Sequence, residues 1–321
     1  MKVVKQSCNS VLLPSTNPMK CIELIGRVCY KSEDKITDDS CKKFIDMLYK
    51  RGHTAMLEHY RFIMQIPPVV YDAISRFNPQ YIKCTNTDGR CIISFNAVGL
   101  MNIVRDSTIT KDKVSIFDQA QLEQIRDDII ACIVKEYDCK ELFGLESNPM
   151  QTIACKFIDN IPQAFETEEE WIAHGWITAQ FTTDRGVTHE IVRHRNNTSF
   201  AQESTRYCNY NKGKFGSEIT VIDQGFEKGS IEYKSWEYAC KVAEMNYQNM
   251  IENLIAPQMA RSVLPTCLKA EIYVTAPVYE WKHIMNLRYH GKKGTPHPLM
   301  QELMTQFKCI VDDMCGMEVF R

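Results

Sequence analysis

Apolar residues recur along this chain with the periods of both helices and strands. Where they recur every three or four residues they predict helices, and where they form short runs between turn residues they predict strands. Asn17 and Pro18 mark one helix start, because asparagine caps a first turn and proline fits the first helical position. The predicted helices cover about residues 17–30, 39–51, 117–137, 187–195, 232–254, 278–288 and 298–315. The predicted strands cover about residues 3–14, 60–66, 176–181 and 270–276, with a turn at 182–186.

Residues 69–170 differ in sequence pattern from the rest of the chain. Amphipathic pieces are joined there by polar turns such as residues 86–89, and an acidic run at residues 166–170 closes the region. That run is more typical of a solvated surface than of a site. No compact cluster of catalytic residue types occurs in the region. We therefore expect an insertion that covers one flank of a single domain, residues 1–321.

Composition and charge exclude several classes of function. The 321 residues, 44% of them hydrophobic, allow a large core and one to three domains. The net charge of −2 argues against a dedicated binder of nucleic acid or of a membrane surface. The first ten residues are too polar for a signal peptide, and no uncharged apolar run approaches the ~20 residues of a membrane span. The 14 cysteines include no CxxC pair, so we expect reduced thiols and a cytoplasmic protein.

Residues 193–207, RHRNNTSFAQESTRY, form what we call the signature segment. Three arginines and one histidine lie in it among short hydrogen-bonding side chains, and Glu203 is its single acid. The planar fork of arginine can grip a phosphate or carboxylate with two parallel hydrogen bonds. We interpret the segment as an anion-recognition element. A surface loop whose arginines form structural ion pairs fits the composition equally well.

A planar substrate that carries a phosphate suits the residues in and around this segment. Arginines and hydroxyls would supply donors to the phosphate, and Glu190 lies three or four residues before Arg193 and His194, on one face of the predicted helix. The candidates for phosphate and sugar are Arg193, Arg206, Arg261, Ser204, Thr205, Gln202 and Glu190. The candidates for a second polar ligand are His53, His194, His283 and His297, although a single histidine is more often a plain hydrogen-bonded residue. The chain has no GxxxxGK[ST], GxGxxG or GxSxG motif.

The signature segment resembles that of the flavin-dependent thymidylate synthases, which is usually Arg-His-Arg, seven residues and then serine. Four further parts of the chain agree with that family in order. They are Cys29-Tyr30, residues 52–59 with Glu58-His59, Ala260-Arg261 before Leu264-Pro265, and residues 275–288 with His297 beyond them. The Arg-His-Arg triplet alone would be a weak signal, whereas the five parts together span nearly the whole chain outside the insertion.

The resemblance implies an α+β fold with a mixed central sheet flanked by helices, a long inserted region and assembly as an oligomer. The family's usual assembly is a homotetramer with active sites between subunits. The implied activity is the methylation of dUMP to dTMP with methylenetetrahydrofolate, using FAD that NADPH reduces. No nucleic-acid partner and no membrane partner are expected.

The resemblance also assigns roles to residues. Arg288 would activate the uracil ring, because a guanidinium near the ring's carbonyl edge stabilises negative charge that develops there. Ser204 is the second catalytic candidate, and we favour it as a hydrogen-bond donor because no base partner is evident. The dUMP contacts would be Glu190, Arg193, Gln202, Glu203, Ser204, Thr205, Arg206, Arg261 and Arg288. The FAD contacts would be Ala55 (from a neighbouring subunit), Arg193, His194, Arg195, Asn196, Gln202, Tyr279, His283, Leu287 and His297. No metal is expected.

The chain departs from the family pattern at two places. Eight residues rather than seven separate Arg195 from Ser204, and the extra residue falls at Asn196 or Asn197, which bears on the flavin contact there. Pro277-Val278-Tyr279 stands where many members have Asn-x-Arg. Two other readings therefore stay open: a catalytically inactive relative kept as a nucleotide- or flavin-binding module, and a nucleic-acid-binding protein, which fits the net charge poorly.

Overall fold

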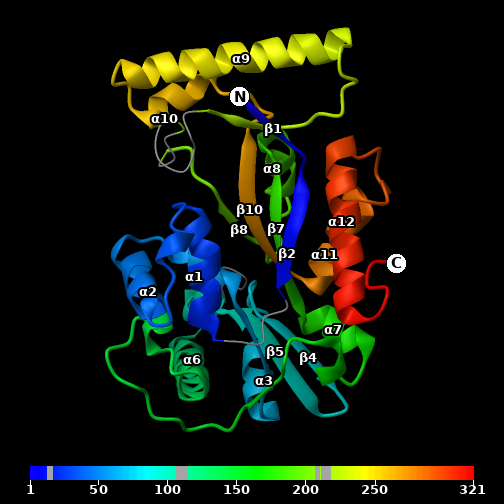
Figure 1. Cartoon of the computed structure of the whole chain (residues 1–321). Coiled ribbons are helices and arrows are strands. Elements are labelled where there is room, and N and C mark those ends of the chain that lie inside the picture. The colour runs from blue at the N-terminus through cyan, green and yellow to red at the C-terminus, as the bar shows by residue number, and fades with distance from the viewer. Residues whose placement is uncertain (13–16, 106–114, 207–209, 211–217) are drawn as a thin grey trace.

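Three β-sheets and the helices around them make up the computed structural model, which describes residues 1–12, 17–105, 115–206, 210 and 218–321 (Figure 1). The end of the predicted first strand and Tyr207 lie outside the described residues. The central sheet has the strand order β2-β7-β10-β8. Its strands are β2 (Ser7–Leu12), β7 (Trp176–Asp184), β8 (Ser199–Gln202) and β10 (Lys269–Pro277). No helix among the described residues is long and apolar enough to cross a membrane.

The expectation of a mixed central sheet is wrong. All three strand pairs of the central sheet are antiparallel. The parallel pair in the described part of the chain is β1 (Lys2–Val4) with β9 (Thr220–Ile222), which forms a separate small sheet. Apolar runs reveal which residues form strands, but strand direction depends on how the connections run, and these runs do not encode it.

A second antiparallel sheet lies below the central sheet in Figure 1 and has the order β4-β5-β3-β6. Its strands are β3 (Arg61–Gln65), β4 (Lys83–Thr87), β5 (Arg90–Asn96) and β6 (Lys156–Phe157). The helices of this region are α3 (Pro68–Ser75), α4 (Ala97–Met101), α6 (Ile116–Tyr137) and α7 (Glu168–His174). Residues 69–170 thus supply three of the four strands, and the turn at Asp88-Gly89 has positive φ at both residues.

Most of the remaining helices match the predicted ranges to within a few residues; the exceptions are the helix predicted at 187–195, which differs, and Pro257–Ala260, which was not predicted. The remaining helices are α1 (Pro18–Val28), α2 (Ser40–Lys50), α8 (Arg185–Ile191), α9 (Ile231–Glu252), α10 (Pro257–Ala260), α11 (Val278–Arg288) and α12 (Pro298–Cys315), with the 3₁₀ segment η2 (Thr54–His59). The Asn17 side chain accepts hydrogen bonds from the backbone N–H groups of Met19 and Lys20, which confirms the predicted cap. Helices α11 and α12 pack against the central sheet through Trp281 and Phe307, whose ring centroids lie 4.3 Å apart.

The structure differs from the predictions around the signature segment. The predicted turn at 182–186 is wrong, because β7 continues to Asp184, whose Oδ1 accepts a hydrogen bond from Val187 N (2.7 Å) and caps α8. The predicted helix to residue 195 ends at Ile191, so Arg193 and His194 lie in the turn that follows. Strand β8 then carries the middle of the signature segment along β10, at the edge of the central sheet.

Candidate active site

Arg288, at the last residue of α11, is held by two side chains from the α8 region. Its Nη1 forms an ion pair with Glu190 Oε2 (2.8 Å), and its Nε donates a hydrogen bond to His194 Nε2 (3.1 Å). These groups are about a hundred residues apart in the chain and meet because β7 and β10 are paired beneath α8 and α11. Fixing two of its nitrogens restricts the guanidinium to one orientation.

His194 is neutral in this arrangement. The ring is 7% exposed, and burial, followed by the charges of Arg288 and His283, lowers the pKa of His194 to about 4. A neutral imidazole accepts at one nitrogen and carries a proton on the other. Because Nε2 accepts from Arg288, the proton of His194 lies on Nδ1. The histidine therefore orients the arginine without adding a second positive charge.

Glu280 and His283, on the first turns of α11, lie beside His194. One potential ligand atom of each of the three residues falls within 4.8 Å of the others, a spacing that can hold a metal ion. Arg288 opposes this use, because it occupies His194 Nε2 and its charge repels a cation. Burial raises the pKa of Glu280, whose carboxylate accepts a hydrogen bond from Asn196 Nδ2 (3.2 Å). The sequence analysis missed Glu280, although its position three residues before His283 places both on one helix face.

The signature segment has a left-handed residue at Asn197, one of the two positions at which its extra residue falls. Asn197 has a φ of 52°, a region that asparagine tolerates better than most residues. Its Nδ2 donates to the Tyr279 hydroxyl (2.7 Å), and its Oδ1 is buried with no hydrogen-bond partner among the described residues. Tyr279, which stands where many relatives have arginine, thus contacts one of the two positions at which the extra residue falls. Arg193 and Arg195 on either side of His194 are exposed.

The second half of the signature segment, residues 202–206, forms hydrogen bonds with α8 and with Arg261. Gln202 Nε2 donates to the Thr188 hydroxyl on α8 (3.0 Å), and Arg261 Nη1 donates to the Thr205 hydroxyl (3.1 Å). Ser204 Oγ accepts a hydrogen bond from Arg206 N (3.3 Å), and no histidine or carboxylate contacts it in the described structure. Thr205 and Arg261 therefore meet across 56 residues of chain.

Glu203 does not face the same side as Ser204. Its carboxylate is buried between the ammonium groups of Lys31 (3.5 Å) and Lys269 (3.8 Å), and both lysines also pair with Glu271. Removing one of these lysines would leave a buried carboxylate with one partner fewer, which destabilises a fold. The assigned flavin residues Ala55 and His297 are exposed, and His297 Nδ1 accepts from Leu299 N at the start of α12. Within the described residues, no hydrogen bond or ion pair joins either of them to Arg288.

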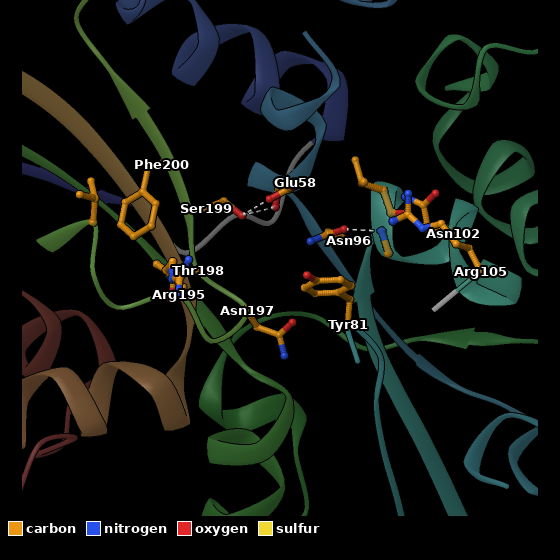
Figure 2. Close-up of a pocket in the computed structure, with 13 residues that line it drawn as sticks. Glu58, Tyr81, Asn96, Asn102, Arg105, Arg195, Asn197, Thr198, Ser199 and Phe200 are labelled. Atoms are coloured by element: carbon orange, nitrogen blue, oxygen red, sulfur yellow. Dashed lines mark hydrogen bonds between the residues drawn. The ribbon is translucent and has the colours of Figure 1, made fainter. Parts of the chain in front are cut away.

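A cavity of about 370 Å³ opens beside the signature segment (Figure 2). One wall is formed by Val192, Arg195 and residues 197–200, and the opposite wall comes from Tyr81, the end of β5, α4 and the residues that follow α4. Glu58 connects the two walls and accepts a hydrogen bond from the Ser199 hydroxyl (3.3 Å). The lining residues of the opposite wall are Tyr81, Asn96, Val98, Gly99, Asn102 and Arg105. The sequence analysis missed this wall, because its residues are scattered over 25 positions without a motif.

Comparison with known proteins confirms the resemblance. The family model described as thymidylate synthase complementing protein matches residues 11–77 and 128–308. The flavin-dependent thymidylate synthase of Pyrococcus abyssi is 33% identical over 104 residues, and that of Pyrococcus horikoshii is 36% identical over 104 residues. Each match covers 32% of this chain and 42% of the relative, so the chain spans less than half of their length.

A solved structure is also similar over most of its length. It is described as a UMP/dUMP methylase from Streptomyces cacaoi bound with 5-Br dUMP, and is 14% identical, covering 100% of this chain and 95% of that one. Its TM-score of 0.39 is too low to carry an argument. The family model, in contrast, matches more than half of the 321 residues, including the Arg288 group and the whole signature segment. This chain therefore belongs to the thymidylate synthase complementing protein family, the family of the flavin-dependent thymidylate synthases.

Proposed function

We propose that this protein is a flavin-dependent thymidylate synthase that converts dUMP to dTMP. The methylene carbon of methylenetetrahydrofolate is transferred to the uracil ring, a hydride completes the methyl group, and the folate leaves as tetrahydrofolate. When bound, FAD that NADPH has reduced supplies that hydride. Family membership and the names of the relatives support the activity, and the arrangement around Arg288 supports the chemistry.

The observation that carries the proposal is the fixed guanidinium of Arg288. Negative charge develops on the pyrimidine as its ring is activated, and a cation already held in place stabilises that charge without reorganising. Glu190 and neutral His194 hold the Nη1 and Nε sides, which leaves Nη2 as the nitrogen without a hydrogen bond in the described structure. Because this effect grows as charge develops, it lowers the barrier more than it strengthens substrate binding.

The residues assigned to FAD fit that cofactor. A flavin dinucleotide presents a planar ring with amide-like edges and a diphosphate. Exposed Arg193 and Arg195 suit the phosphates, and the amide of Asn196, the unpaired Oδ1 of Asn197 and the ring of His283 suit the polar edges. These side chains would bind and orient the cofactor beside Arg288.

The dUMP phosphate would lie at the end of the signature segment. Arg206 and Arg261 are exposed there; Ser204 and Thr205 directly precede Arg206, and Arg261 contacts the Thr205 hydroxyl. Two guanidinium groups and two hydroxyls form a set of donors that suits a phosphate monoester. Gln202 and Glu190 would then lie on the side of the sugar and the ring.

The proposal includes a single domain with an insertion and assembly as a homotetramer. The family model leaves residues 78–127 unmatched, which supports the insertion. The largest exposed apolar residues on α9 are Ile231, Tyr238 and Met245, spaced by seven and therefore on one face. Its buried residues, Cys240 and Tyr247, face the same chain. The exposed stripe supports an interface with another copy.

Spectroscopy and product analysis test the proposal together. The purified protein should show a flavin absorbance band that NADPH bleaches. Incubation with dUMP, methylenetetrahydrofolate, FAD and NADPH should yield dTMP. A protein that binds dUMP or FAD but forms no dTMP would instead be the inactive relative, and a colourless protein that refuses added FAD would contradict the proposed synthase.

A further inference from the structure

Two buried thiols meet beneath α9, and neither has a role in the proposed reaction. Cys240 lies in the middle of α9, and Cys267 lies two residues before β10, at the end of that strand nearest α9 in Figure 1. Their Sγ atoms are 3.4 Å apart, although the residues lie 27 positions apart in the chain. They pack with Val221, Tyr247 and Leu268 in a small hydrophobic core that is separate from the main one. A covalent bond between the two sulfurs would therefore link α9 to the central sheet.

Two hydrogen bonds distinguish Cys267 as the more reactive of the two thiols. The indole Nε1 of Trp236 donates to Cys267 Sγ (3.3 Å), and an indole nitrogen can only donate. Because Cys267 Sγ already accepts there, the proton between the two sulfurs belongs to Cys240. The hydrogen bond from Cys240 lowers the pKa of the Cys267 thiol to about 7 despite its burial, and donating that bond raises the pKa of Cys240. The thiolate is the form of cysteine that attacks an oxidant, so Cys267 is the nucleophile and Cys240 the second thiol.

Cys267 is also the thiol that a small oxidant can reach. The residue is 7% exposed, whereas Cys240 is 1% exposed. This access suits hydrogen peroxide, which is little larger than water, better than a bulky disulfide. The expected reducing compartment would keep both residues as thiols until peroxide rises.

We propose that Cys240 and Cys267 form a redox-active dithiol, which hydrogen peroxide converts to a disulfide that restrains the segment between them. The Cys267 thiolate attacks one peroxide oxygen, so that the S–O bond forms, the O–O bond breaks and hydroxide leaves. The Cys240 sulfur then attacks Cys267 Sγ, the S–S bond forms, and the oxygen leaves as water with the Cys240 proton. Two thiols thereby lose two electrons, and one peroxide becomes two waters once the first hydroxide takes up the proton that Cys267 had released. A thiol reductant restores the pair by thiol–disulfide exchange.

The disulfide would restrain the part of the chain that carries Arg261. The segment between the two cysteines contains the second half of α9, α10 and Arg261, whose Nη1 donates to the Thr205 hydroxyl (3.1 Å). A disulfide bond is about 2.0 Å long, so the sulfurs need to approach by roughly 1.4 Å, which side-chain rotation can supply. Closing this loop removes open conformations of the segment, so its local unfolding becomes rarer.

Peptide mapping of the purified protein before and after hydrogen peroxide treatment tests the chemistry. Free thiols are alkylated first, so that only linked cysteines stay unlabelled. We expect a linked peptide pair that contains Cys240 and Cys267, is two hydrogen atoms lighter than the reduced pair, and is released by dithiothreitol. The mapping also separates this link from one between Cys132 and Cys155, whose thiols are hydrogen-bonded as well. Cys309→Ser, which removes an exposed thiol on α12, is the matched control and should form the link as the wild-type protein does.

Trp236 reports on the same bond without a cysteine substitution. A disulfide in contact with an indole quenches its fluorescence, so the emission of the wild-type protein should fall as the link forms. Trp236→Phe should abolish that fall and slow formation of the link by roughly two- to tenfold, because it removes one hydrogen bond to the thiolate. An unchanged rate in this variant would overturn the role of Cys267 as the nucleophile.

Hydrogen exchange measures the restraint. Backbone amides of residues 256–264 should exchange at least about tenfold more slowly in the oxidised protein than in the reduced protein, while α12 should not change. Cys240→Ser and Cys267→Ser, treated in the same way, should show no slowing, and circular dichroism before treatment verifies that both are folded. Recovery of both cysteines as free thiols from the treated wild-type protein would overturn the proposal, as would a link that leaves the exchange unchanged. None of these measurements requires dUMP, flavin or folate, so their outcome is independent of the proposed function.

Discussion

At the scale of single residues, the site depends on which side chains hold Arg288 rather than on Arg288 alone. Glu190 supplies the opposite charge, and His194 supplies a neutral acceptor. Sequence reasoning identified all three residues as candidates from the family pattern. It did not predict that they contact one another, because a contact between α8 and α11 depends on how the strands beneath them pair.

Arg288→Ala should leave the fold intact and reduce kcat by about 10²–10³-fold, the usual effect of removing one group that stabilises developing charge. The dissociation constant for dUMP should change much less, because the charge matters most as the ring becomes anionic. Single-turnover kinetics and dUMP titration measure the two effects separately. A near-native rate in this variant would rule out the ring-activation role.

His194 should contribute a pH dependence to stability between about pH 4 and 6.5. An unfolded histidine titrates near pH 6.5, whereas burial beside Arg288 lowers the pKa of His194 to about 4. Between these values the unfolded chain binds a proton that the folded chain excludes, so the free energy of unfolding rises with pH in this window. Urea unfolding at several pH values should show a steeper rise for the wild-type protein than for His194→Gln. Equal slopes would contradict the neutral state of His194.

At the scale of elements, the periods of apolar residues predicted the bounds of most helices well. They did not predict which elements pack against or pair with one another. The prediction of 278–288 coincides with α11, because its apolar face and the start after Pro277 are both local features. Strand β8 was missed, because its four residues are too few to show alternation between polar neighbours. The cavity wall was missed for a different reason. Its residues come from two separate pieces, Tyr81 and residues 96–105, which lie on either side of the paired strands β4 and β5.

The ion pairs around Glu203 couple α1 to the central sheet, and their loss should destabilise the fold. Lys31 lies just beyond α1 and contacts both Glu203 and Glu271. Lys31→Ala should lower the free energy of unfolding by about 1–3 kcal/mol, because it leaves a buried carboxylate with one partner fewer. Lys50→Ala on α2, where an exposed pair with Asp46 is broken, should cost less than about 0.5 kcal/mol. Chemical denaturation of both variants compares the two sites, and equal effects would contradict the role of Lys31.

At the scale of the whole molecule, α9 leaves most of its surface exposed in the single chain. It lies across the top of the molecule in Figure 1, and just two of its 22 residues are buried in this single chain. A helix of that length with an apolar stripe on its outer face suits a subunit interface. The residues assigned to neighbouring subunits, such as Ala55, are exposed here, as a site shared between copies requires.

Tyr238→Glu should disrupt assembly, because it places a charge in the middle of the stripe formed with Ile231 and Met245. Sedimentation velocity should show a smaller species than the wild-type protein, with loss of dTMP formation. Ala239→Glu places the same charge on the next exposed residue, about 100° around the helix, and should leave the assembly intact. If both variants sediment as the wild-type protein does, α9 does not form the interface.

Sites built between subunits should also allow complementation. His53→Ala and Arg288→Ala would each inactivate the homomeric enzyme, and mixed assemblies would contain some sites with both native residues. Mixing the two variants under conditions that exchange subunits should therefore restore part of the activity. Absence of rescue, with exchange verified by labelled subunits, would indicate sites formed within one chain.

The left-handed conformation of Asn197 limits which amino acids evolution can use at that position. Glycine would adopt the backbone angle more easily but would lose the bond to Tyr279, and a β-branched residue would strain the turn. In a saturation library selected for growth without thymidine, asparagine should dominate, followed by aspartate and glycine. Valine and isoleucine should be the rarest residues recovered.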